Sequence, residues 1–292
     1  MKTTLSLALS LFICTTAYSQ NTWIVDQSGA GDFTEIQLAI DSLSVVDGDE
    51  VIVKDGTYFE HINFNQKEIL LRSENGAATT IIDGGGSGDV VSIINGEQAP
   101  TELRGFTVTG GNRGVYAFNY ADSLISGCII SHNILVGVYI SENVKLKIYN
   151  SAINENSLAA TGPGGGIHAL NSSLVIEATQ FTNNWTVGEN YQPAHGAAIY
   201  LERNVDTLIS DCLFNSNVTK GGANSTGYGG AIFAGNSDLS VSNSIFENNK
   251  ATSYYNANGQ PPAKGGAIYS DQSSNLTEFD TAFIDNETAG AP

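Results

Sequence analysis

The chain alternates apolar and polar residues at a period of two in short runs, and these runs recur in a fixed order. One half of the repeat is a small residue, then Val or Ile, then usually an aromatic residue, as in Ala231-Ile232-Phe233. The other half ends in a large apolar residue with Asn three positions later, as in Phe246 and Asn249. Alternation at this period is typical of short β-strands that bury one face. We therefore predict strands in both halves.

Six copies of this unit follow one another between residues 114 and 286. The separation between the inward Val or Ile and the large apolar residue stays at 14 or 15 residues, as from Ile232 to Phe246. The separation from that residue to the next copy grows along the chain, from 8 residues (Ile130 to Val138) to 22 (Phe246 to Ile268). The constant part indicates a rigid scaffold, and the variable part indicates loops that accept insertions on one side of the molecule.

A repeat of about two dozen residues cannot bury its own apolar face, but stacked copies close a continuous core. We therefore predict an all-β fold, a parallel β-helix. Ahead of it, Ile36, Ala39, Ile40 and Leu43 recur at helical spacing, and residues 34–37 have the Thr-x-x-Gln pattern of a capping box. We expect this short N-terminal helix to cover the open end of the stack, where a bare strand edge would promote aggregation. The predicted division is a cap and first coil over residues 20–80 and β-helix repeats over residues 81–292.

Two columns of the repeat have a structural interpretation. Small polar residues recur two positions before the large apolar residue, and Cys128 and Cys212 both fall in this column. The two cysteines are three coils apart, which at about 4.8 Å per coil is about 14 Å and too far for a disulfide. We predict two buried free thiols. The Asn column should form a hydrogen-bonded amide ladder along the stack. It runs through Asn133, Asn156, Asn184, Asn217, Asn249 and Asn286.

Charge and the first residues indicate where the protein acts. The net charge is -18, so nucleic acid and anionic lipid surfaces would be repelled. Lys2, an apolar run from Leu5 to Ile13 and small residues around Ala17 predict a secretory signal peptide over residues 1–19. No later apolar run of the sequence is long enough to span a bilayer as a helix. We therefore expect a secreted or cell-surface protein.

No capping element follows Asn286, so we expect the chain to continue beyond residue 292.

The residue after each inward Ile or Val must point outward, which gives a column of mostly aromatic residues at coil spacing. We expect this exposed aromatic column to stack on sugar rings or to pack against a partner. The alternative is that it lies under the long loops or serves as a structural ladder. Its members are Tyr116, Tyr139, His168, Tyr200, Phe233 and Tyr269.

The long loops leave the same corner of successive coils, so their side chains should stand side by side as a lateral wall. This loop wall combines aromatic residues with several of the few basic residues, which is the composition expected for polysaccharide binding in an acidic protein. The alternative is that loops simply collect such residues. Its members are Trp185, Tyr191, His195, Lys220, Tyr228, Lys250, Tyr254, Tyr255 and Lys264. No Cys or carboxylate stands at metal-ligand spacing from His168 of the column or from His195 of the wall, so we expect no metal site.

Two segments resemble known families. Gly31-Asp32-Phe33 with Ile36-Gln37 and Ala39-Ile40, followed by Gly56-Thr57-Tyr58 and Glu60, resembles the N-terminal segment of pectin-lyase-fold proteins, pectin methylesterases among them. This resemblance implies a right-handed parallel β-helix. Gly229-Gly230-Ala231-Ile232 and Phe246-Glu247-Asn248-Asn249 are similar to the GGAI and FxxN motifs of chlamydial polymorphic outer-membrane protein repeats. That resemblance implies a surface-displayed β-helix with a role in adhesion.

A catalytic function has less support, and no catalytic residue is assigned. The sequence lacks the Gln-Asp pair, the Asp-Phe-Ile-Phe-Gly segment and the Gly-Arg-Pro-Trp segment that pectin methylesterases share. A pectate-lyase-like enzyme needs acidic calcium ligands beside a Lys or Arg base. Asp211 and Asp280 share one column of the repeat, but Ala178 and Asn243 occupy that column in other units. The column therefore does not form the cluster of acidic calcium ligands that a lyase needs.

We therefore predict an adhesin-like binding protein for a polysaccharide, a cell-surface glycan or another surface ligand, without a cofactor. The alternative is a polysaccharide lyase or esterase of the same fold, and calcium is the ion to expect if it is a lyase. A third interpretation is a spacer between other domains.

Overall fold

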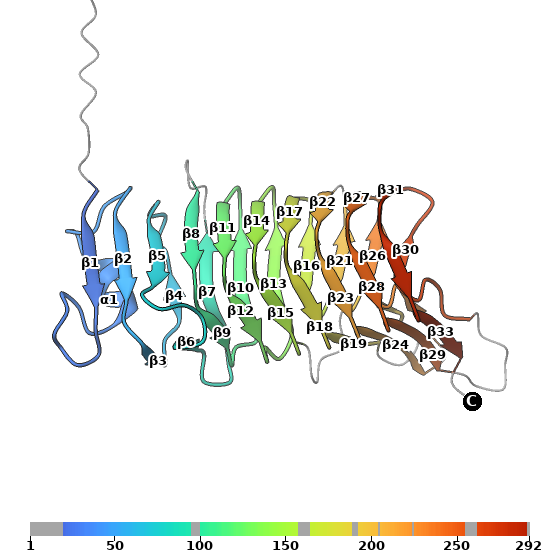
Figure 1. Ribbon diagram of the computed structural model, residues 1–292, viewed down its shortest axis with the longest axis horizontal. Coiled ribbons are helices and arrows are strands. Elements are labelled where there is room, and N and C mark those ends of the chain that lie inside the picture. Colours follow the sequence, from blue (N-terminus) through green and yellow to red (C-terminus); the bar gives the residue numbers. More distant parts are fainter. Residues whose placement is uncertain are drawn as a thin grey trace, which may run out of the picture.

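The computed structural model describes residues 20–94, 100–156, 164–188, 192–203, 205–223, 225–254 and 262–290. Its strands pair in parallel and stack coil upon coil, so that successive turns of the chain lie side by side along the long axis (Figure 1). This arrangement confirms the predicted all-β parallel β-helix. The predicted signal peptide lies outside the described residues.

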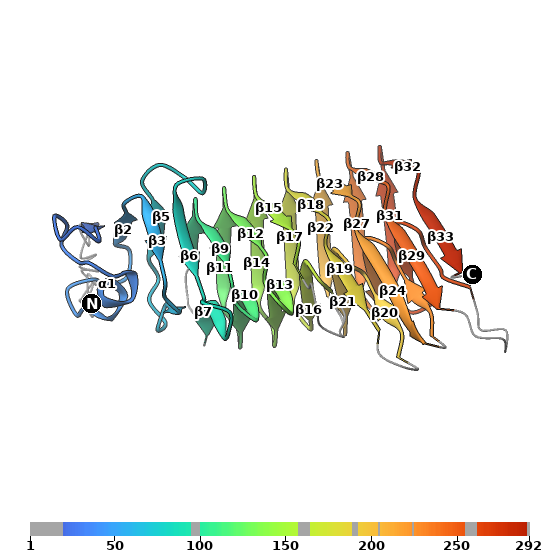
Figure 2. The same ribbon diagram turned by 90° about the horizontal axis from the view of Figure 1, so that it is seen from below.

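Three long sheets form the sides of the β-helix, and most coils contribute one strand to each (Figure 2). Sheet A contains, in order, β1 (Thr22–Val25), β2 (Glu50–Val53), β5 (Leu70–Ser73), β8 (Thr101–Arg104), β11 (Asp122–Ser126), β14 (Lys145–Tyr149), β17 (Ser173–Glu177), β22 (Asp206–Ser210), β27 (Asp238–Ser242) and β31 (Asn275–Phe279). Sheet B contains β3 (Gly56–Tyr58), β6 (Thr80–Asp83), β9 (Thr107–Thr109), β12 (Ile129–Ser131), β15 (Ala152–Asn154), β18 (Gln180–Thr182), β23 (Leu213–Asn215), β28 (Ile245–Glu247) and β32 (Ala282–Ile284). Sheet C contains β4 (Ile62–Asn63), β7 (Asp89–Ile94), β10 (Arg113–Phe118), β13 (Val136–Ser141), β16 (Ile167–Leu170), β21 (Ile199–Glu202), β26 (Ile232–Gly235) and β30 (Ile268–Ser270).

The insertions of the later coils add two smaller parallel sheets between sheets B and C. Sheet D contains β19 (Trp185–Val187), β24 (Val218–Ala223), β29 (Lys250–Tyr254) and β33 (Glu287–Gly290). Sheet E contains β20 (Ala194–His195) and β25 (Gly227–Tyr228), and Tyr228 is bridged in parallel to Lys264 of the next coil. The growing sequence separation between repeats therefore corresponds to extra paired strands.

The core lies inside the stack, because the period-two alternation of each strand sends every second side chain inward. Val115 and Val138 are in register on sheet C and are fully buried. On sheet B, the rings of Phe181, Phe214 and Phe246 stack with centroids 4.7 and 4.4 Å apart and nearly parallel planes. Burying one such ring contributes about 1.5–3 kcal/mol to the stability of the fold.

The corner between sheets A and B requires left-handed backbone. The residue that provides it is Ala178, Asp211, Asn243 or Asp280 in four successive coils, with φ between 46° and 55°. Asn and Asp tolerate this conformation better than most residues, since their short polar side chains can hydrogen-bond to the local backbone. The column shared by Asp211 and Asp280 is therefore a turn position.

The predicted Asn ladder is confirmed at the corner that follows sheet B. The Asn156 Nδ2 donates to Asn184 Oδ1 at 3.1 Å, and the Asn184 Nδ2 donates to Asn217 Oδ1 at the same distance. The Asn184 Nδ2 also donates to the backbone oxygen of Ile153 at 2.7 Å. These amides are fully buried and satisfy backbone groups at a corner that has no continuous strand ladder, so the column is structural.

The predicted free thiols are also confirmed. Cys128 and Cys212 are buried and unpaired by disulfide. Burial raises the pKa of each thiol to about 11, because the thiolate would lose its hydration inside the stack.

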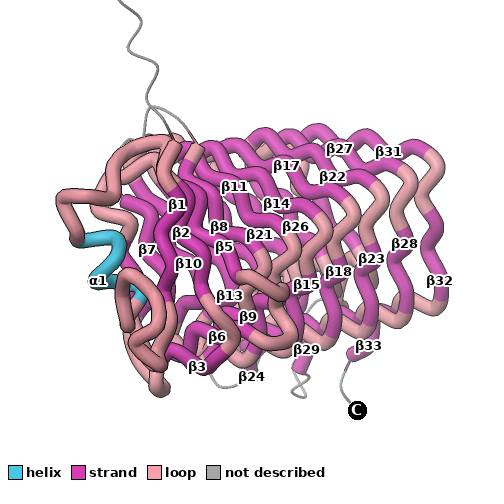
Figure 3. The backbone as a smooth tube through the Cα atoms, turned by 60° about the vertical axis from the view of Figure 1, so that its left-hand side comes forward, coloured by secondary structure: helices cyan, strands magenta, loops and turns pink. Residues whose placement is uncertain are grey.

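A short helix covers the N-terminal end of the stack, as predicted (Figure 3). Helix α1 (Ile36–Asp41) buries Ile36, Ala39 and Ile40 against the first coil. Leu43 does not belong to the buried face; it lies beyond the end of α1 and is 96% exposed. The predicted capping box is wrong, because the N-cap residue is Glu35 and its side chain makes no capping hydrogen bond.

The Glu60 carboxylate caps α1 in its place. Its two oxygens accept hydrogen bonds from the backbone N–H groups of Ile36 and Gln37, at 2.9 and 2.8 Å. A carboxylate at this position satisfies two free donors of the first turn and interacts favourably with the helix dipole. The cap is therefore attached to the coil by a residue distant in sequence, which a local capping pattern could not reveal.

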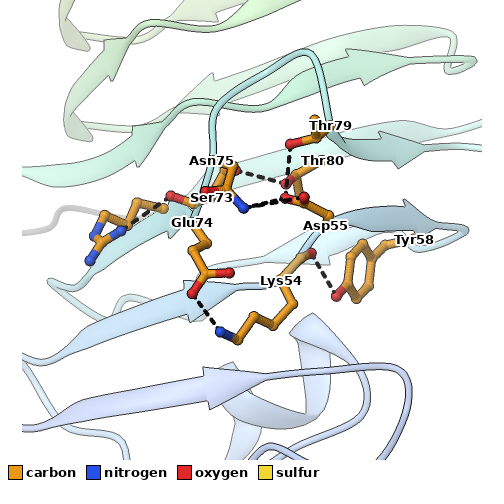
Figure 4. A network of polar contacts seen from close by, with 9 residues as sticks. Lys54, Asp55, Tyr58, Ser73, Glu74, Asn75, Thr79 and Thr80 are labelled. Atoms are coloured by element: carbon orange, nitrogen blue, oxygen red, sulfur yellow. Dashed lines mark hydrogen bonds and ion pairs between the residues drawn. The ribbon is translucent and has the colours of Figure 1, made fainter.

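Polar side chains join the first coils to each other where the Asn ladder is absent (Figure 4). The Asp55 carboxylate accepts hydrogen bonds from Asn75 Nδ2 at 3.1 Å and from Thr79 Oγ1 at 2.8 Å. Lys54 forms an ion pair with Glu74. These contacts connect the segment after β2 with the segment after β5, so they hold neighbouring coils in register.

Candidate functional site: the aromatic ladder and the loops beside it

The predicted aromatic column forms one continuous row of ring contacts on the outer face of sheet C, which we call the aromatic ladder. Its members lie in register on β10, β13, β16, β21, β26 and β30, because each follows the inward Ile or Val of its strand. Successive centroids are 5.7 Å apart from Tyr116 to Tyr139, 4.8 Å to His168, 4.9 Å to Tyr200, 5.3 Å to Phe233 and 5.7 Å to Tyr269. The centroid separations follow the coil spacing, and the rings meet as stacked, tilted and edge-to-face pairs.

The side chains of this column are less exposed than predicted. Tyr200 is buried, with 7% of its surface exposed, and the other members are half-buried. Each ring loses exposed area to its neighbours in the ladder, and the C-terminal members are also covered by the inserted loops. The Tyr200 hydroxyl donates to Glu202 at 2.7 Å, which satisfies its polar end.

Part of the predicted loop wall lies directly on the ladder and forms its cover. His195, Tyr228 and Lys264 follow one another in sheet E and the adjoining bridge, and the rings of His195 and Tyr228 stack at 5.4 Å. The His195 ring is 4.4 Å from that of Phe233, and Tyr228 is 4.9 Å from Tyr269. We call His195, Tyr228 and Lys264 the loop cover.

The rest of the predicted wall occupies sheet D, so the wall is divided between two sheets. Trp185 and Lys250 share one register column through Val218, while Lys220 lies two positions farther along β24. Lys250 forms an ion pair with Glu287 at 2.9 Å, and Lys220 is exposed. The prediction that loops of successive coils stand side by side is confirmed for these strands. Tyr191 and Tyr255 lie outside the described residues, as does the side chain of Tyr254.

The two histidines of this site stay uncharged at neutral pH. Burial lowers the pKa of both His168 and His195 to about 4, because the imidazolium form would lose its hydration among aromatic rings. Arg203 lowers the pKa of His168 further, whereas Glu202 acts in the opposite direction on His195. The buried Nε2 of His168 has no hydrogen-bond partner among the described residues. These rings therefore act as neutral aromatic surfaces.

The N-terminal end of the ladder differs from the covered end. Among the described residues, no side chain of sheet D or E makes a ring or cation contact with Tyr116 or Tyr139. The Arg113 guanidinium lies 3.8 Å from the Tyr116 centroid and 5.4 Å from that of Tyr139, and Phe118 stacks beside Tyr116 at 5.9 Å. We call Arg113, Tyr116, Phe118 and Tyr139 the open end of the ladder.

The open end combines apolar ring faces with a fixed charge pair. Arg113 donates to both oxygens of Asp89, from Nε at 2.5 Å and from Nη2 at 2.8 Å. Beyond Tyr116, the same register column continues as Ser92 and Asn63, whose side chains are short. Ring faces beside directional polar groups suit a ligand with one apolar face and a polar edge. Sequence reasoning missed Arg113 and Phe118. Phe118 follows from the strand alternation around Tyr116, whereas Arg113 has the parity of the buried Val115 and Ala117, so alternation alone would have placed it inward.

A second surface feature, on sheet A, was not predicted. Hollows of about 250 and 330 Å³ adjoin along the outer face of β14, β17, β22, β27 and β31 and share Asp206 as a lining residue. Lys145 lies at one end, Asp238 and Asn275 lie toward the other, and Leu208 between them is 58% exposed. Part of the signal was in the sequence: Lys145 and Asp238 stand one position before an inward Leu-x-Ile or Leu-x-Val pair. Asp206 holds the same place before Thr207-x-Ile209.

The described residues contain neither a membrane-spanning helix nor a cluster of metal ligands. Within them, no helix is both long and apolar enough to cross a membrane. No group of three or more His, Cys, Asp or Glu side chains in the same residues is placed to hold a metal ion.

Comparison with protein families identifies the architecture. The family model described as "Right handed beta helix region" matches residues 90–282, which is more than half of the chain. The chain belongs to the right-handed β-helix family. The handedness implied by the resemblance to pectin-lyase-fold proteins is thereby confirmed.

Two curated proteins are similar to parts of this β-helix chain. A cell surface glycoprotein of Methanothermus fervidus is 31% identical over 116 residues, covering 37% of this chain and 16% of that protein. The probable autotransporter YfaL of Escherichia coli is 37% identical over 97 residues, covering 31% of this chain and 6% of that protein. The chain thus spans a small part of the length of these relatives.

Solved structures with a similar course of the chain include pectin methylesterase from carrot, with a TM-score of 0.47 and 13% identity over 91% of this chain and 83% of that one. Pectate lyase Pel9A has a TM-score of 0.46 and 14% identity, covering 94% of this chain and 79% of that one.

Proposed function

We propose that this β-helix is a binding module of an exported or cell-surface protein and that its ligand is a glycan, bound at the open end of the aromatic ladder. The observation that carries the proposal is the arrangement of Tyr116, Phe118 and Tyr139 beside the Arg113–Asp89 pair. A sugar ring has an apolar face that can stack on an aromatic ring and hydroxyl groups that can bond to the arginine and the carboxylate. The covered end offers no comparable free surface.

The proposed location, outside the cell or at its surface, is supported by the names of similar proteins and by the sequence. A cell surface glycoprotein and a probable autotransporter both match part of this β-helix. The predicted signal peptide and the net charge of -18 agree with a protein that acts outside the cell and does not bind nucleic acid. Adhesion, as in the chlamydial repeats that the later copies resemble, is one role that such glycan binding would serve.

The proposal is tested by retention of the purified chain on a panel of immobilised neutral and uronic-acid polysaccharides. Tyr116→Ala and Tyr139→Ala should each weaken retention about two- to tenfold, since stacking on one ring is worth about 0.5–1.5 kcal/mol. Phe59→Ala is the matched control, because Phe59 is 74% exposed and lies outside the ladder. Equal retention of all three variants and the parent chain would contradict the open end as the binding surface.

The enzymatic alternative is tested on the same polysaccharides in solution. If the chain only binds, incubation with and without calcium should release neither unsaturated products nor methanol. Release of either product above a heat-inactivated control would replace the binding proposal with a lyase or an esterase activity.

A further inference from the structure

The hollow over β17 on sheet A is distinct from the aromatic ladder, which lies on sheet C. Its volume is about 250 Å³, and Asn143, Lys145, Asn171, Ser173 and Asp206 are among its lining residues. Asn143 and Asn171 lie at the corner that leads from sheet C into sheet A, and both have left-handed backbone, with φ of 63° and 43°. The corner therefore presents two amide side chains at the rim of the hollow.

Register explains why a hollow forms here. Lys145 on β14 pairs with Ser173 on β17, which pairs with Asp206 on β22. The two charged residues are thus two coil spacings apart, about 10 Å between their backbones at about 4.8 Å per coil. The short Ser173 side chain between them leaves the space open.

The two charges at the ends of this hollow have no partners. In the described residues, neither the Lys145 ammonium nor the Asp206 carboxylate makes an ion pair or a side-chain hydrogen bond, and both residues are exposed. Asp122 is the register neighbour of Lys145 on the other side, and it makes no ion pair with it. By contrast, Arg72 is paired with the carboxylate of Glu50 on the adjacent strand of the same sheet.

We infer that this hollow binds a dipolar ligand, a molecule that carries both a carboxylate and an ammonium group. The ligand carboxylate pairs with Lys145 and the ligand ammonium with Asp206, while the amides of Asn143 and Asn171 bond to polar groups between them. A polyanion is disfavoured by Asp206 and by Asp238 farther along the sheet, and a simple cation is disfavoured by Lys145. Opposite charges at fixed separation select a ligand by the distance between its two groups.

The test measures binding of glycine, γ-aminobutyrate and ε-aminocaproate to the full chain by calorimetry or by NMR titration. Affinity should rise with the distance between the two charged groups, so that ε-aminocaproate binds best. Hexanoate and hexylamine, which each carry one of the two charges, should bind at least about tenfold more weakly than ε-aminocaproate, since a charge-assisted hydrogen bond is lost.

Matched variants separate this site from its surroundings. Lys145→Met and Asp206→Asn should each weaken ε-aminocaproate binding about tenfold. Lys147→Met and Asp211→Asn are the controls, because these residues lie on β14 and directly after β22 but outside the hollow, and they should leave the affinity unchanged. Equal affinity for all three amino acids, or equal effects of site and control variants, would overturn the inference.

The inference stands apart from the proposed glycan function. Tyr116→Ala should leave ε-aminocaproate binding unchanged, and Asp206→Asn should leave glycan retention unchanged. Loss of both activities in either variant, with the far-ultraviolet circular dichroism of the parent chain preserved, would show one shared site and contradict the two-site assignment.

Discussion

Burial within a row of aromatic rings sets the chemistry of individual residues in this protein. His168 and His195 could serve as general bases near neutral pH if they were solvated, since an unperturbed imidazole has a pKa of about 6.5. Among aromatic neighbours, burial instead lowers the pKa of both to about 4. The same effect raises the pKa of the thiols of Cys128 and Cys212 to about 11, so these residues are packing groups.

The histidine shift predicts a pH dependence of stability. Above about pH 6.5 the imidazole of His168 is neutral in both the folded and the unfolded chain, so it adds no pH dependence. Between about pH 6.5 and its folded pKa of about 4, the unfolded chain binds the proton first, and the free energy of unfolding falls as the pH falls. Urea unfolding at several pH values in this window measures the effect. As the pH falls, the free energy of unfolding should decrease less for His168→Phe than for the parent chain.

The comparison with His168→Phe removes the contribution of the carboxylates, which titrate in both proteins. Phe should be accommodated at this position, because Phe233 occupies the same column two coils away. Identical pH profiles for the two proteins would contradict the assignment of a neutral buried imidazole.

At the scale of elements, the coils are held together by columns of like residues. The Asn ladder links each corner to the next through buried amides, and the Phe stack does the same for the core beneath sheet B. The register between successive coils is therefore fixed by one small set of contacts, and each repeat contributes the same contacts. This also explains why Asn recurs at its position while the loops that follow change in length.

Removing one member of the Asn ladder should be costly. In Asn184→Ala, the backbone N–H of Asn156 and the amides on both sides lose buried partners. We expect the free energy of unfolding to fall by about 2–4 kcal/mol, since each unsatisfied buried group costs about 1–3 kcal/mol. Urea unfolding measures this change.

The matched control for the ladder is the preceding residue. Asn183 is exposed and has left-handed backbone with φ of 54°, so Asn183→Gly should change stability by less than about 0.5 kcal/mol. A similar loss of stability in both variants would show that the corner, and not the amide ladder, accounts for the effect.

The N-terminal cap depends on a contact distant in sequence. Glu60→Ala should destabilise the protein by about 1 kcal/mol, because the first turn of α1 loses the acceptor of two backbone N–H groups. Glu35→Ala is expected to be nearly neutral, since the Glu35 side chain makes no capping hydrogen bond. Thermal unfolding of the two variants distinguishes these cases, and the reverse order of effects would contradict the assignment of Glu60 as the cap.

At the scale of the whole molecule, stability is shared between neighbouring coils and is not uniform along the axis. Side chains of the central coils are fully buried, as Phe246 is, whereas Phe283 in the last described coil is 45% exposed. Hydrogen exchange followed by mass spectrometry should therefore show faster exchange in β31 and β32 than in β14 and β15. Uniform protection along the axis would contradict this gradient.

Much of the fold could be predicted because its contacts repeat in sequence. The alternating Ile and Val positions, the column with Cys128 and Cys212 and the Asn ladder each depend on register between identical units, which the spacing of the repeats fixes. The cap was only partly predictable: the helix follows from Ile36, Ala39 and Ile40, but Glu60 is supplied by a later segment. Local periodicity carries no information about such a partner.

The sequence by itself determined that the chain forms stacked coils, which side chains point inward and which columns run along the axis, because strand alternation and repeat spacing are local properties. Only the tertiary structure decided which outward residues stay accessible. The loops before Ile199 and Ile232 fold back as sheet E and cover one end of the aromatic ladder, while Arg113 flanks the other. The tertiary structure also placed Lys145 and Asp206 at the two ends of one hollow. Accessibility and pairing depend on how insertions fold over their neighbours, and the lengths of the insertions do not specify that.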